Sequence, residues 1–341
     1  MAVSIQDVAA RAGVSVSTVG RAFTNPRRVS AKTRHHVLMI AAEMGYQVSR
    51  SASALKSGQS KRVALLINET LDIWFNGSVL SGMNAVLQPA GYDVSVYERV
   101  DDIRTRDEFF HTLPLRRNAD AVVVASFGID PHEVAQLSTL NVPIVGINVP
   151  TSEGLDASIS IDDRDGMRMA ARHLIQLGHR DIVYLCSETT DEQNLAYSTD
   201  ERVFGFEDAG AESGARVNMQ TMTLPRNLVE AIDSAISQLC SLDSFPTGIC
   251  CQSDSLAIPL IERLHQMGRA VPGDCSVVGF DDMALADAFG LTTIRQNPHA
   301  MGENAARKVL ALIGGDMLTE AHETAATQLM ARRTTAVPRK R

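Results

Sequence analysis

The sequence predicts an α/β protein in which a small helix-turn-helix head of three helices precedes a larger body. We expect the body to have two lobes, each a parallel sheet covered by helices. Short helical patterns fill the first 45 residues, whereas strand and helix patterns alternate from residue 62 onward. Charge divides at the same place: residues 1–62 hold ten basic and two acidic residues, and the remainder holds 22 basic and 38 acidic residues. A basic head beside an acidic body indicates that the head binds a polyanion.

The composition is typical of a globular protein without membrane-spanning segments. Hydrophobic residues make up 45% and charged residues 21% of the chain, and no run of about 18 apolar residues occurs. The N-terminal stretch MAVSIQDVAARAG is interrupted by charge, unlike a secretory signal. The five cysteines form no C-x-x-C pair, which favours reduced thiols over a disulfide framework or a zinc site. We therefore expect a cytoplasmic protein without a metal or cofactor.

Three helix patterns predict the helix-turn-helix head. The first begins after Ser4, has Asp7 in a position close to that of a capping box, and ends at Gly13. The second lies within VSVSTVGRAF and ends before an Asn-Pro pair, and the third, SAKTRHHVLMIAAEMGY, opens at Ser30. Helices this short are stable only when they pack together, so the spacing predicts a helix-turn-helix bundle.

The second helix presents side chains that suit the major groove of DNA. Val16 can contact a thymine methyl group, Ser17 can hydrogen-bond to a base edge, and Arg21 can bind guanine. Gly20 is unexpected inside a helix, where it costs about 1 kcal/mol relative to Ala. It either permits close approach to the duplex or packs against the first helix.

Repeated strand and helix patterns predict the α/β body. The body has about 280 residues, more than a single hydrophobic core usually contains, so two lobes are expected. Parallel sheets bind ligands at the carboxyl ends of their strands. The expected strands span residues 62–68, 92–98, 119–126, 142–148, 180–186, 247–253 and 275–282.

The head resembles that of the LacI/GalR family of bacterial transcriptional regulators. The residues that carry the resemblance are SIQDVAARAGVSVSTVGRAFTNPRRVSAKTR, which depart from the family pattern at Gly20, where Ser is usual. The following YQVSRSASALKSG resembles the family hinge, with Ser49 and Ser53 in place of Asn and Arg. The resemblance implies a DNA-binding head over residues 1–48 and a hinge over 49–61. It implies DNA contacts by Val16, Ser17, Thr18, Arg21, Ser30, Lys32, Thr33 and Leu55, with Leu55 as a minor-groove wedge.

The body also resembles this family throughout. The motifs are DRDGMRMAARHLIQLGHRDIVYL, ERVFGFEDA and VPGDCSVVGFDDMALADAFGLTTIRQNPHAMGENAARKVLALIGG. The resemblance implies a fold of the type I periplasmic binding proteins over residues 62–341, with three crossovers near Ser158, Thr293 and Ala325. Lobe 1 would then contain about 62–158 and 294–324, and lobe 2 about 159–293 and 325–338.

A small effector is expected between the lobes. By position in the family pattern, Arg202 and Asp281 are the strongest candidates, because Arg and Asp hydrogen-bond well to hydroxyl groups. Trp74, the only Trp of the chain, either stacks on a sugar face or fills the lobe core. The candidate effector-binding residues are Trp74, Phe75, Ser126, Asn148, Asp163, Arg202, Ser253 and Asp281.

Catalysis is not expected, and no catalytic residue is predicted. The chain contains no G-x-G-x-x-G, G-x-x-x-x-G-K-[ST] or G-x-S-x-G motif. His173, His179 and the Asp pairs at 101–102, 162–163 and 281–282 lie in helices or turns, where packing and local hydrogen bonding are their usual roles.

The sequence therefore favours a cytoplasmic, homodimeric transcriptional repressor that binds a pseudo-palindromic operator in double-stranded DNA. A sugar or sugar-like effector would lower its affinity for the operator. Two alternatives remain open. One is a regulator that requires a purine or a central metabolite as corepressor, and the other is a cytosolic solute sensor whose head does not bind DNA.

Overall fold

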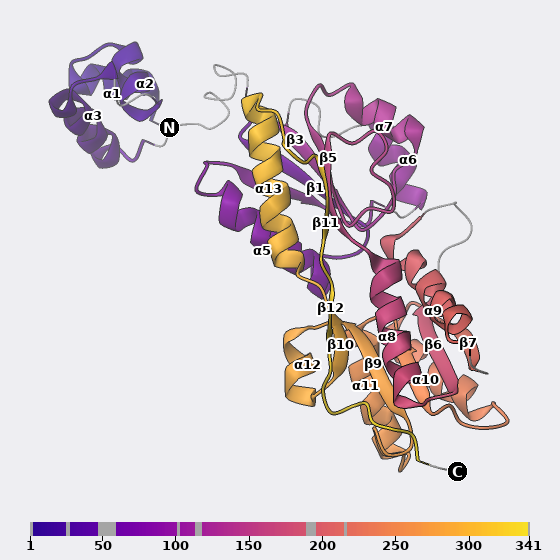
Figure 1. The fold of residues 1–341 in the computed structure, drawn as a ribbon. Helices are drawn as coiled ribbons and strands as arrows, with labels where there is room; N and C mark the ends of the chain where they lie inside the picture. Colours follow the sequence, from indigo (N-terminus) through magenta and orange to yellow (C-terminus); the bar gives the residue numbers. More distant parts are fainter. Residues whose placement is uncertain are drawn as a thin grey trace. The chain divides into compact units, whose positions relative to one another are not determined.

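The structure is a computed structural model that describes residues 3–24, 28–46, 59–100, 103–112, 118–188, 196–214 and 217–339. The chain divides into two compact units, Met1–Lys61 and Arg62–Arg341 (Figure 1). The first unit is the head and the second is the body. The predicted hinge residue Leu55 and the Asp pair at 101–102 lie outside the described residues.

The head contains α1 (Ile5–Ala12), α2 (Val16–Thr24) and α3 (Ala31–Glu43). Ser4 and Asp7 form a capping box, and Gly13 ends α1 with φ of 63°, in the left-handed region. Apolar side chains of all three helices share one buried cluster: Val8, Ala9, Ala12, Val19, Ala22, Val37, Ile40 and Ala41. The expected three-helix bundle is therefore present, and burial of this shared cluster stabilises it.

Lobe 1 of the body is built on a six-stranded parallel sheet of order β11-β5-β4-β3-β1-β2. Nearly every residue of β1, β3 and β4 is buried, as expected for central parallel strands. The strands are β1 (Arg62–Ile67), β2 (Asp93–Tyr97), β3 (Ala121–Ala125), β4 (Ile144–Ile147), β5 (Ala157–Ile161) and β11 (His322–Ala325).

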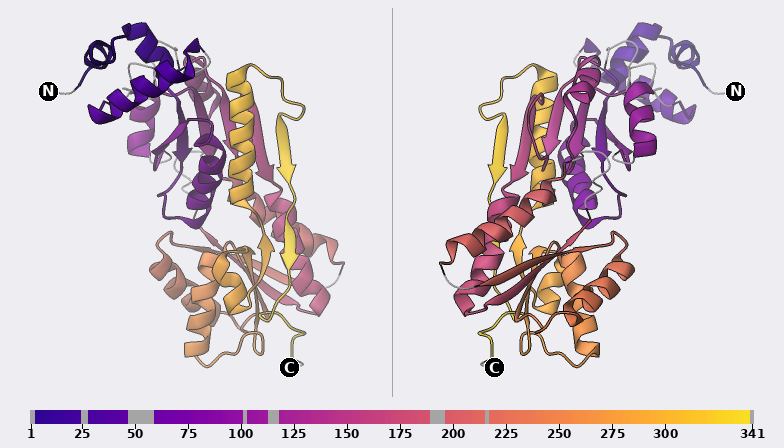
Figure 2. Two further views of the ribbon diagram at one scale, coloured as in Figure 1. Left: turned by 90° about the vertical axis from the view of Figure 1, so that its left-hand side faces the viewer. Right: turned by 90° about the vertical axis from the view of Figure 1, so that its right-hand side faces the viewer.

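Lobe 2 has a second six-stranded sheet of order β12-β10-β9-β8-β6-β7, in which only β12 runs antiparallel to its neighbour. The two sheets lie one beyond the other in the body (Figure 2). The strands are β6 (Asp181–Ser187), β7 (Asn218–Leu224), β8 (Gly248–Cys251), β9 (Ser276–Asp281), β10 (Thr292–Arg295) and β12 (Gln328–Met330).

Helices cover both faces of each sheet. In lobe 1, α5 and α13 pack on one face and α6 and α7 on the other, and in lobe 2 α8 and α9 oppose α10 and α11. The short α12 follows β9. The helices are α5 (Trp74–Leu87), α6 (Ile103–Thr112), α7 (Pro131–Ser138), α8 (Asp163–Leu177), α9 (Glu201–Glu212), α10 (Leu228–Cys240), α11 (Asp254–Gln266), α12 (Ala284–Phe289) and α13 (Pro298–Gly314). This arrangement confirms the predicted fold class.

Two glycines allow α5 and α13 to lie side by side (Figure 1). A Cβ atom on Gly82 of α5 would lie 2.0 Å from the carbonyl oxygen of His299, and one on Gly302 of α13 would lie 2.3 Å from that of Val79. Any side chain at either position would therefore force the two helices apart.

The chain crosses between the lobes three times: after β5, after β10 and between β11 and β12. These crossings lie up to four residues further along the chain than Ser158, Thr293 and Ala325. The reason is that β5 pairs with β11 through Ile161, and β10 pairs with β9 through Arg295. Residues 159–161 and 325 therefore lie in lobe 1, and residues 294–295 lie in lobe 2.

Candidate ligand cavity and DNA-binding surface

The carboxyl ends of strands from both sheets meet at a cavity of about 340 Å³ in the body. This is the edge at which parallel α/β sheets bind ligands. Seven of the eight candidate effector-binding residues line the cavity: Trp74, Phe75, Ser126, Asn148, Arg202, Ser253 and Asp281.

Arg202 forms the charged centre of the cavity wall. It lies in the first turn of α9 and is only 3% exposed. Its Nε donates to Asp163 Oδ1 at 2.7 Å, its Nη1 donates to the carbonyl oxygen of Gln252 at 2.5 Å, and its guanidinium lies 3.6 Å from the ring centroid of Phe280. Burial lowers the pKa of Arg202, but the carboxylates of Asp163 and Asp281 outweigh burial and raise the pKa overall. Arg202 is therefore a fixed cation whose hydrogen-bonding plane is already oriented.

Asp163 is the one effector candidate that does not line the cavity. Its carboxylate lies behind Arg202, and its Oδ2 accepts a hydrogen bond from Asn148 Nδ2 at 3.1 Å. Both oxygens are thus used within the protein, and Asp163 orients Arg202.

Asp281 ends β9 and is also buried. Its Oδ1 accepts a hydrogen bond from Gln296 Nε2 at 2.6 Å. Burial raises the pKa of Asp281 to about 7, and the neighbouring Arg202 limits the rise. The carboxyl group therefore changes charge near neutral pH.

On the lobe 1 side of the cavity, two residues directly after strands have strained backbone conformations. Ser126 follows β3 with φ of 69° and Asn148 follows β4 with φ of 48°, and both values lie in the left-handed region. Such residues cluster at functional sites because the surrounding structure must hold them in place. Asn148 accepts from the backbone N–H of Ile161 at 3.0 Å and donates to Ser198 Oγ at 3.0 Å, so its amide is fixed.

Two aromatic residues of α5 complete this wall. Trp74 and Phe75 begin the helix and line the cavity, while Phe75 also packs against the buried cluster of the lobe. Trp74 is half-buried and lines the cavity, so it does not simply fill the lobe core. On the lobe 2 side, Ser253 caps α11 by accepting from the N–H of Leu256 at 3.3 Å.

Sequence reasoning missed several lining residues. Asn68 and Glu69 follow β1, Glu188 follows β6, Gln252 follows β8 and Gln296 follows β10. Their position directly after a strand is the signal that would have found them. Tyr197 and Arg226, which also line the cavity, follow no such rule.

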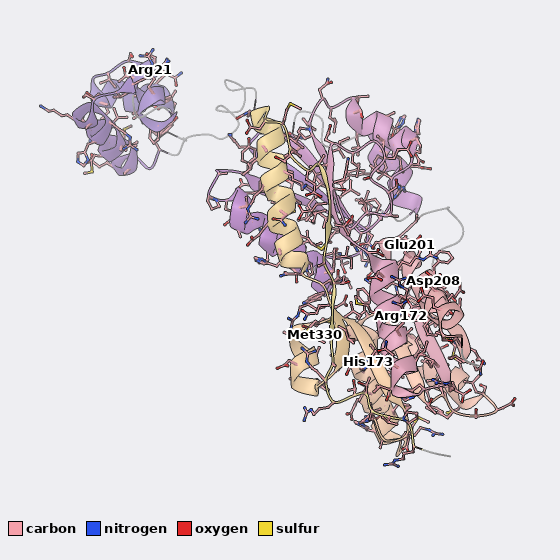
Figure 3. The ribbon with its side chains drawn as sticks, in the orientation of Figure 1. Arg21, Arg172, His173, Glu201, Asp208 and Met330 are labelled. Atoms are coloured by element: carbon pink, nitrogen blue, oxygen red, sulfur yellow. The ribbon has the colours of Figure 1, made fainter. Side chains whose placement is uncertain are left out.

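Four of the residues considered for catalysis make local contacts: Asp162, Asp282, His173 and His179. Asp162 caps α8, and Asp282 pairs with Arg295 and Arg332. His173 (Figure 3) contacts Thr335 Oγ1 at 2.9 Å, and His179 contacts the carbonyl oxygen of Ala336 at 2.9 Å.

The second candidate site is the outer face of α2 in the head. Val16 is 42% exposed, and Ser17 and Arg21 (Figure 3) are also exposed. At 3.6 residues per turn, Gly20 lies between Val16 and Ser17 on this face. A Cβ atom on Gly20 would meet no atom within 4 Å outside its own helical turn, so packing against α1 does not require glycine here.

The hydroxyl groups near this face are engaged with one another. Ser15 Oγ lies 2.8 Å from Ser17 Oγ and 2.8 Å from Thr18 Oγ1, and it accepts from the N–H of Thr18 at 3.1 Å. Ser15 is therefore the cap of α2.

The start of α3 offers a further surface for phosphate groups. Ser30 caps this helix by accepting from the N–H of Thr33 at 3.1 Å, and its Oγ lies 2.8 Å from Thr33 Oγ1. Lys32 is exposed in the first turn, where the helix dipole also favours an anion.

Among the residues that the structure describes, no helix is long and apolar enough to cross a membrane. The described part of the chain also contains no group of three or more His, Cys, Asp or Glu side chains placed to hold a metal ion.

Comparison with known proteins finds matches to both units of the chain. Residues 4–49 match the model for bacterial regulatory proteins of the lacI family, and residues 171–335 match the model for periplasmic binding protein-like domains. The HTH-type transcriptional regulator GalR of Escherichia coli K12 is 29% identical over 337 residues, which is 98% of this chain and 96% of GalR.

Two solved structures show the same fold. The Lac repressor dimer bound to operator and to the anti-inducer ONPF is 23% identical, with a TM-score of 0.82 over 98% of this chain and 100% of that chain. A complex of the transcriptional regulator CelR with cellobiose is 23% identical, with a TM-score of 0.67 and the same coverage. Residues 4–49 therefore form a head of the lacI family of bacterial regulatory proteins, the body has a periplasmic binding protein-like fold, and the chain is similar over nearly its whole length to transcriptional regulators such as GalR.

Proposed function

We propose that this protein is a cytoplasmic transcriptional repressor that binds a pseudo-palindromic operator as a homodimer. A small sugar or sugar-like molecule binds in the cavity of the body and lowers the affinity for the operator. Coupling of this kind amounts to about 1–3 kcal/mol and is reciprocal, so operator DNA also weakens ligand binding.

The residues that line the cavity support a sugar as the class of ligand. Aromatic side chains (Trp74, Phe75 and Tyr197) lie among many uncharged amide and hydroxyl groups, and Arg202 and Asp281 stand together at the centre. Aromatic faces bind the apolar face of a sugar ring, and fixed amide, carboxylate and guanidinium groups bind its hydroxyls. The CelR–cellobiose complex, which has this fold, supports the same class of ligand.

The outer face of α2 would enter the major groove. Val16, Ser17, Thr18 and Arg21 would contact base edges there. Ser30, Lys32 and Thr33 would contact phosphates, and Leu55 would enter the minor groove.

The deciding experiment is selection of genomic DNA fragments on the purified protein, repeated with a panel of sugars and purines. We expect an enriched pseudo-palindrome that one sugar releases. Enrichment only in the presence of a ligand would instead make the ligand a corepressor, and no enrichment under any condition would show that the head does not bind DNA.

Ligand binding can be measured independently of DNA. Trp74 is the only Trp of the chain and lines the cavity, so its fluorescence reports on the cavity directly. The releasing sugar is expected to change this fluorescence in a saturable titration. An unchanged signal would contradict binding at this site.

A further inference from the structure

Residues 196–198, which join β6 to α9 in lobe 2, are attached to lobe 1 at the edge of the cavity. The N–H of Gly128, in the loop after β3, donates to the carbonyl oxygen of Ala196 at 2.8 Å, and Phe127 and Tyr197 form an antiparallel bridge. Asn148 Nδ2 donates to Ser198 Oγ at 3.0 Å. This attachment is additional to the three crossings of the chain.

The ring of Tyr197 is the apolar part of this attachment. Tyr197 is 7% exposed and belongs to the buried cluster of lobe 1, which includes Phe110, Phe127 and Leu137. Burying the Tyr197 ring stabilises the contact between the lobes about as much as burial stabilises an aromatic residue of the core. A side chain carried by lobe 2 is thus part of the core of lobe 1.

The lobe 1 side of the attachment is rigid. Arg106 Nη2 donates to the carbonyl oxygen of Gly128 at 2.9 Å, and its guanidinium lies 5.4 Å from the ring centroid of Phe127. Arg106 is held in turn by a buried bidentate pair with Glu133, at 2.6 and 2.5 Å.

On the lobe 2 side, the attachment is followed along the chain by α9, which carries Arg202 at the centre of the cavity wall. The N–H of Tyr197 donates to Asp200 Oδ2 at 2.8 Å, just before α9 begins, and Arg202 lies in the first turn of that helix. Arg226 Nη2 also approaches Tyr197 Oη, at 3.4 Å. Tyr197 and Ser198 line the cavity themselves.

We propose that residues 196–198 form an inter-lobe latch, with Tyr197 as the positioning residue that couples closure of the lobes to the placement of Arg202. The latch releases lobe 1 when ligand enters or leaves the cavity, and it closes again around bound ligand. This role in ligand response rests on the proposed function. The latch itself is testable without ligand or DNA.

A disulfide can lock the latch without changing a residue that lines the cavity. A Cβ atom on Gly128 would lie 3.7 Å from the Cβ of Ala196, and disulfides have Cβ–Cβ distances of about 3.8 Å. The test protein is full-length Gly128→Cys/Ala196→Cys in a Cys240→Ser background, because Cys240 is the exposed native cysteine and the other four are buried. The two single-cysteine variants are the matched controls.

Three readouts decide the proposal. In folded protein the cysteine pair should cross-link on mild oxidation, and the cross-link should reduce the quenching of Trp74 fluorescence by acrylamide. Tyr197→Ala, in the absence of ligand, should increase that quenching. When reduced, the double variant should keep its response of operator affinity to the releasing sugar, and oxidation should abolish the response.

The proposal is overturned if the cysteines do not cross-link in the folded protein. It is also overturned if they cross-link and neither the quenching nor the ligand response changes. Failure of the wild-type protein to bind any DNA contradicts the proposed function alone, because cross-linking and quenching need no DNA.

Discussion

Arg202 and Asp163 form a buried ion pair at 2.7 Å, in which both side chains are less than 5% exposed. Asp163 begins α8, immediately after the first crossing between the lobes, and it also accepts a hydrogen bond from Asn148 of lobe 1. A residue that lines the cavity, a residue at the first crossing between the lobes and a residue of the opposite lobe are therefore connected by two hydrogen bonds. Such a connection gives ligand binding a physical route to the relative position of the lobes.

Removing Arg202 should abolish ligand binding and also destabilise the body. Arg202→Ala leaves the Asp163 carboxylate buried without its cation, and breaking a buried pair in this way costs about 3–5 kcal/mol. Chemical denaturation of the body measures the loss. Arg168→Ala, which removes partly exposed ion pairs of α8 with Asp165 and Glu212, is the matched control and should have a much smaller effect. Equal losses for the two variants would contradict the role of burial.

Asp281 should make stability depend on pH. Burial raises its pKa from 3.8 to about 7, so between these values the folded protein holds a proton that the unfolded chain releases. Stability contributed by this group therefore falls as the pH rises, by about 1.4 kcal/mol per pH unit within that window. Asp281→Asn keeps an acceptor for Gln296 and should remove this slope. Unfolding curves of both proteins at several pH values test the prediction, and identical slopes would refute it.

Arg21 should read a base in the operator. Arg21→Ala should weaken operator binding by about 1–3 kcal/mol and relax the preference at one base pair, because a bidentate contact with guanine would be lost. Affinity for a randomised operator library measures both effects. An equal loss on random DNA would assign Arg21 to a phosphate contact.

Gly20 should have opposite effects on stability and binding. Gly20→Ala meets no steric obstacle in the head and should stabilise α2 by about 1 kcal/mol. If close approach of the α2 backbone to DNA is required, the same change should nevertheless weaken operator binding. Thermal unfolding and operator titration test the two effects.

The matched control for Gly20→Ala is Ala42→Gly, at an exposed position of α3, which should destabilise the head while leaving the outer face of α2 intact. Operator affinity that rises together with stability in Gly20→Ala would show that glycine is not needed for approach.

The sequence predicted the central strands well because parallel strands buried on both faces are continuous apolar runs, as in RVALLI and AVVVA. It did not identify five of the strands: β5, β7, β10, β11 and β12. Of these, β7, β11 and β12 are edge strands with exposed or partly exposed positions. The interior strands β5 (ASISI) and β10 (TTIR) contain Ser or Thr and so lack the continuous apolar run of the other interior strands. Ser126, Asn148, Ser253 and Asp281 line the cavity because strand ends converge at one edge of a sheet, whereas Trp74, Phe75 and Arg202 lie in the first turns of helices.

Two placements could not be predicted from the sequence. Asp163 lies behind Arg202 because Arg202 and Asn148 occupy its two carboxylate oxygens. Tyr197 reaches the cavity only because its backbone pairs with Phe127 of the other lobe. Both depend on contacts between segments that are far apart in the chain.

The last strands of the two sheets have a consequence for synthesis on the ribosome. The head is complete once Glu43 has emerged, whereas lobe 1 requires β11 (His322–Ala325) and lobe 2 requires β12 (Gln328–Met330). Because domains fold as units while the chain is being made, the head folds long before either sheet can be finished. A chain whose translation stops before residue 322 would therefore carry a folded head on a body in which neither sheet, and hence neither side of the cavity, is complete.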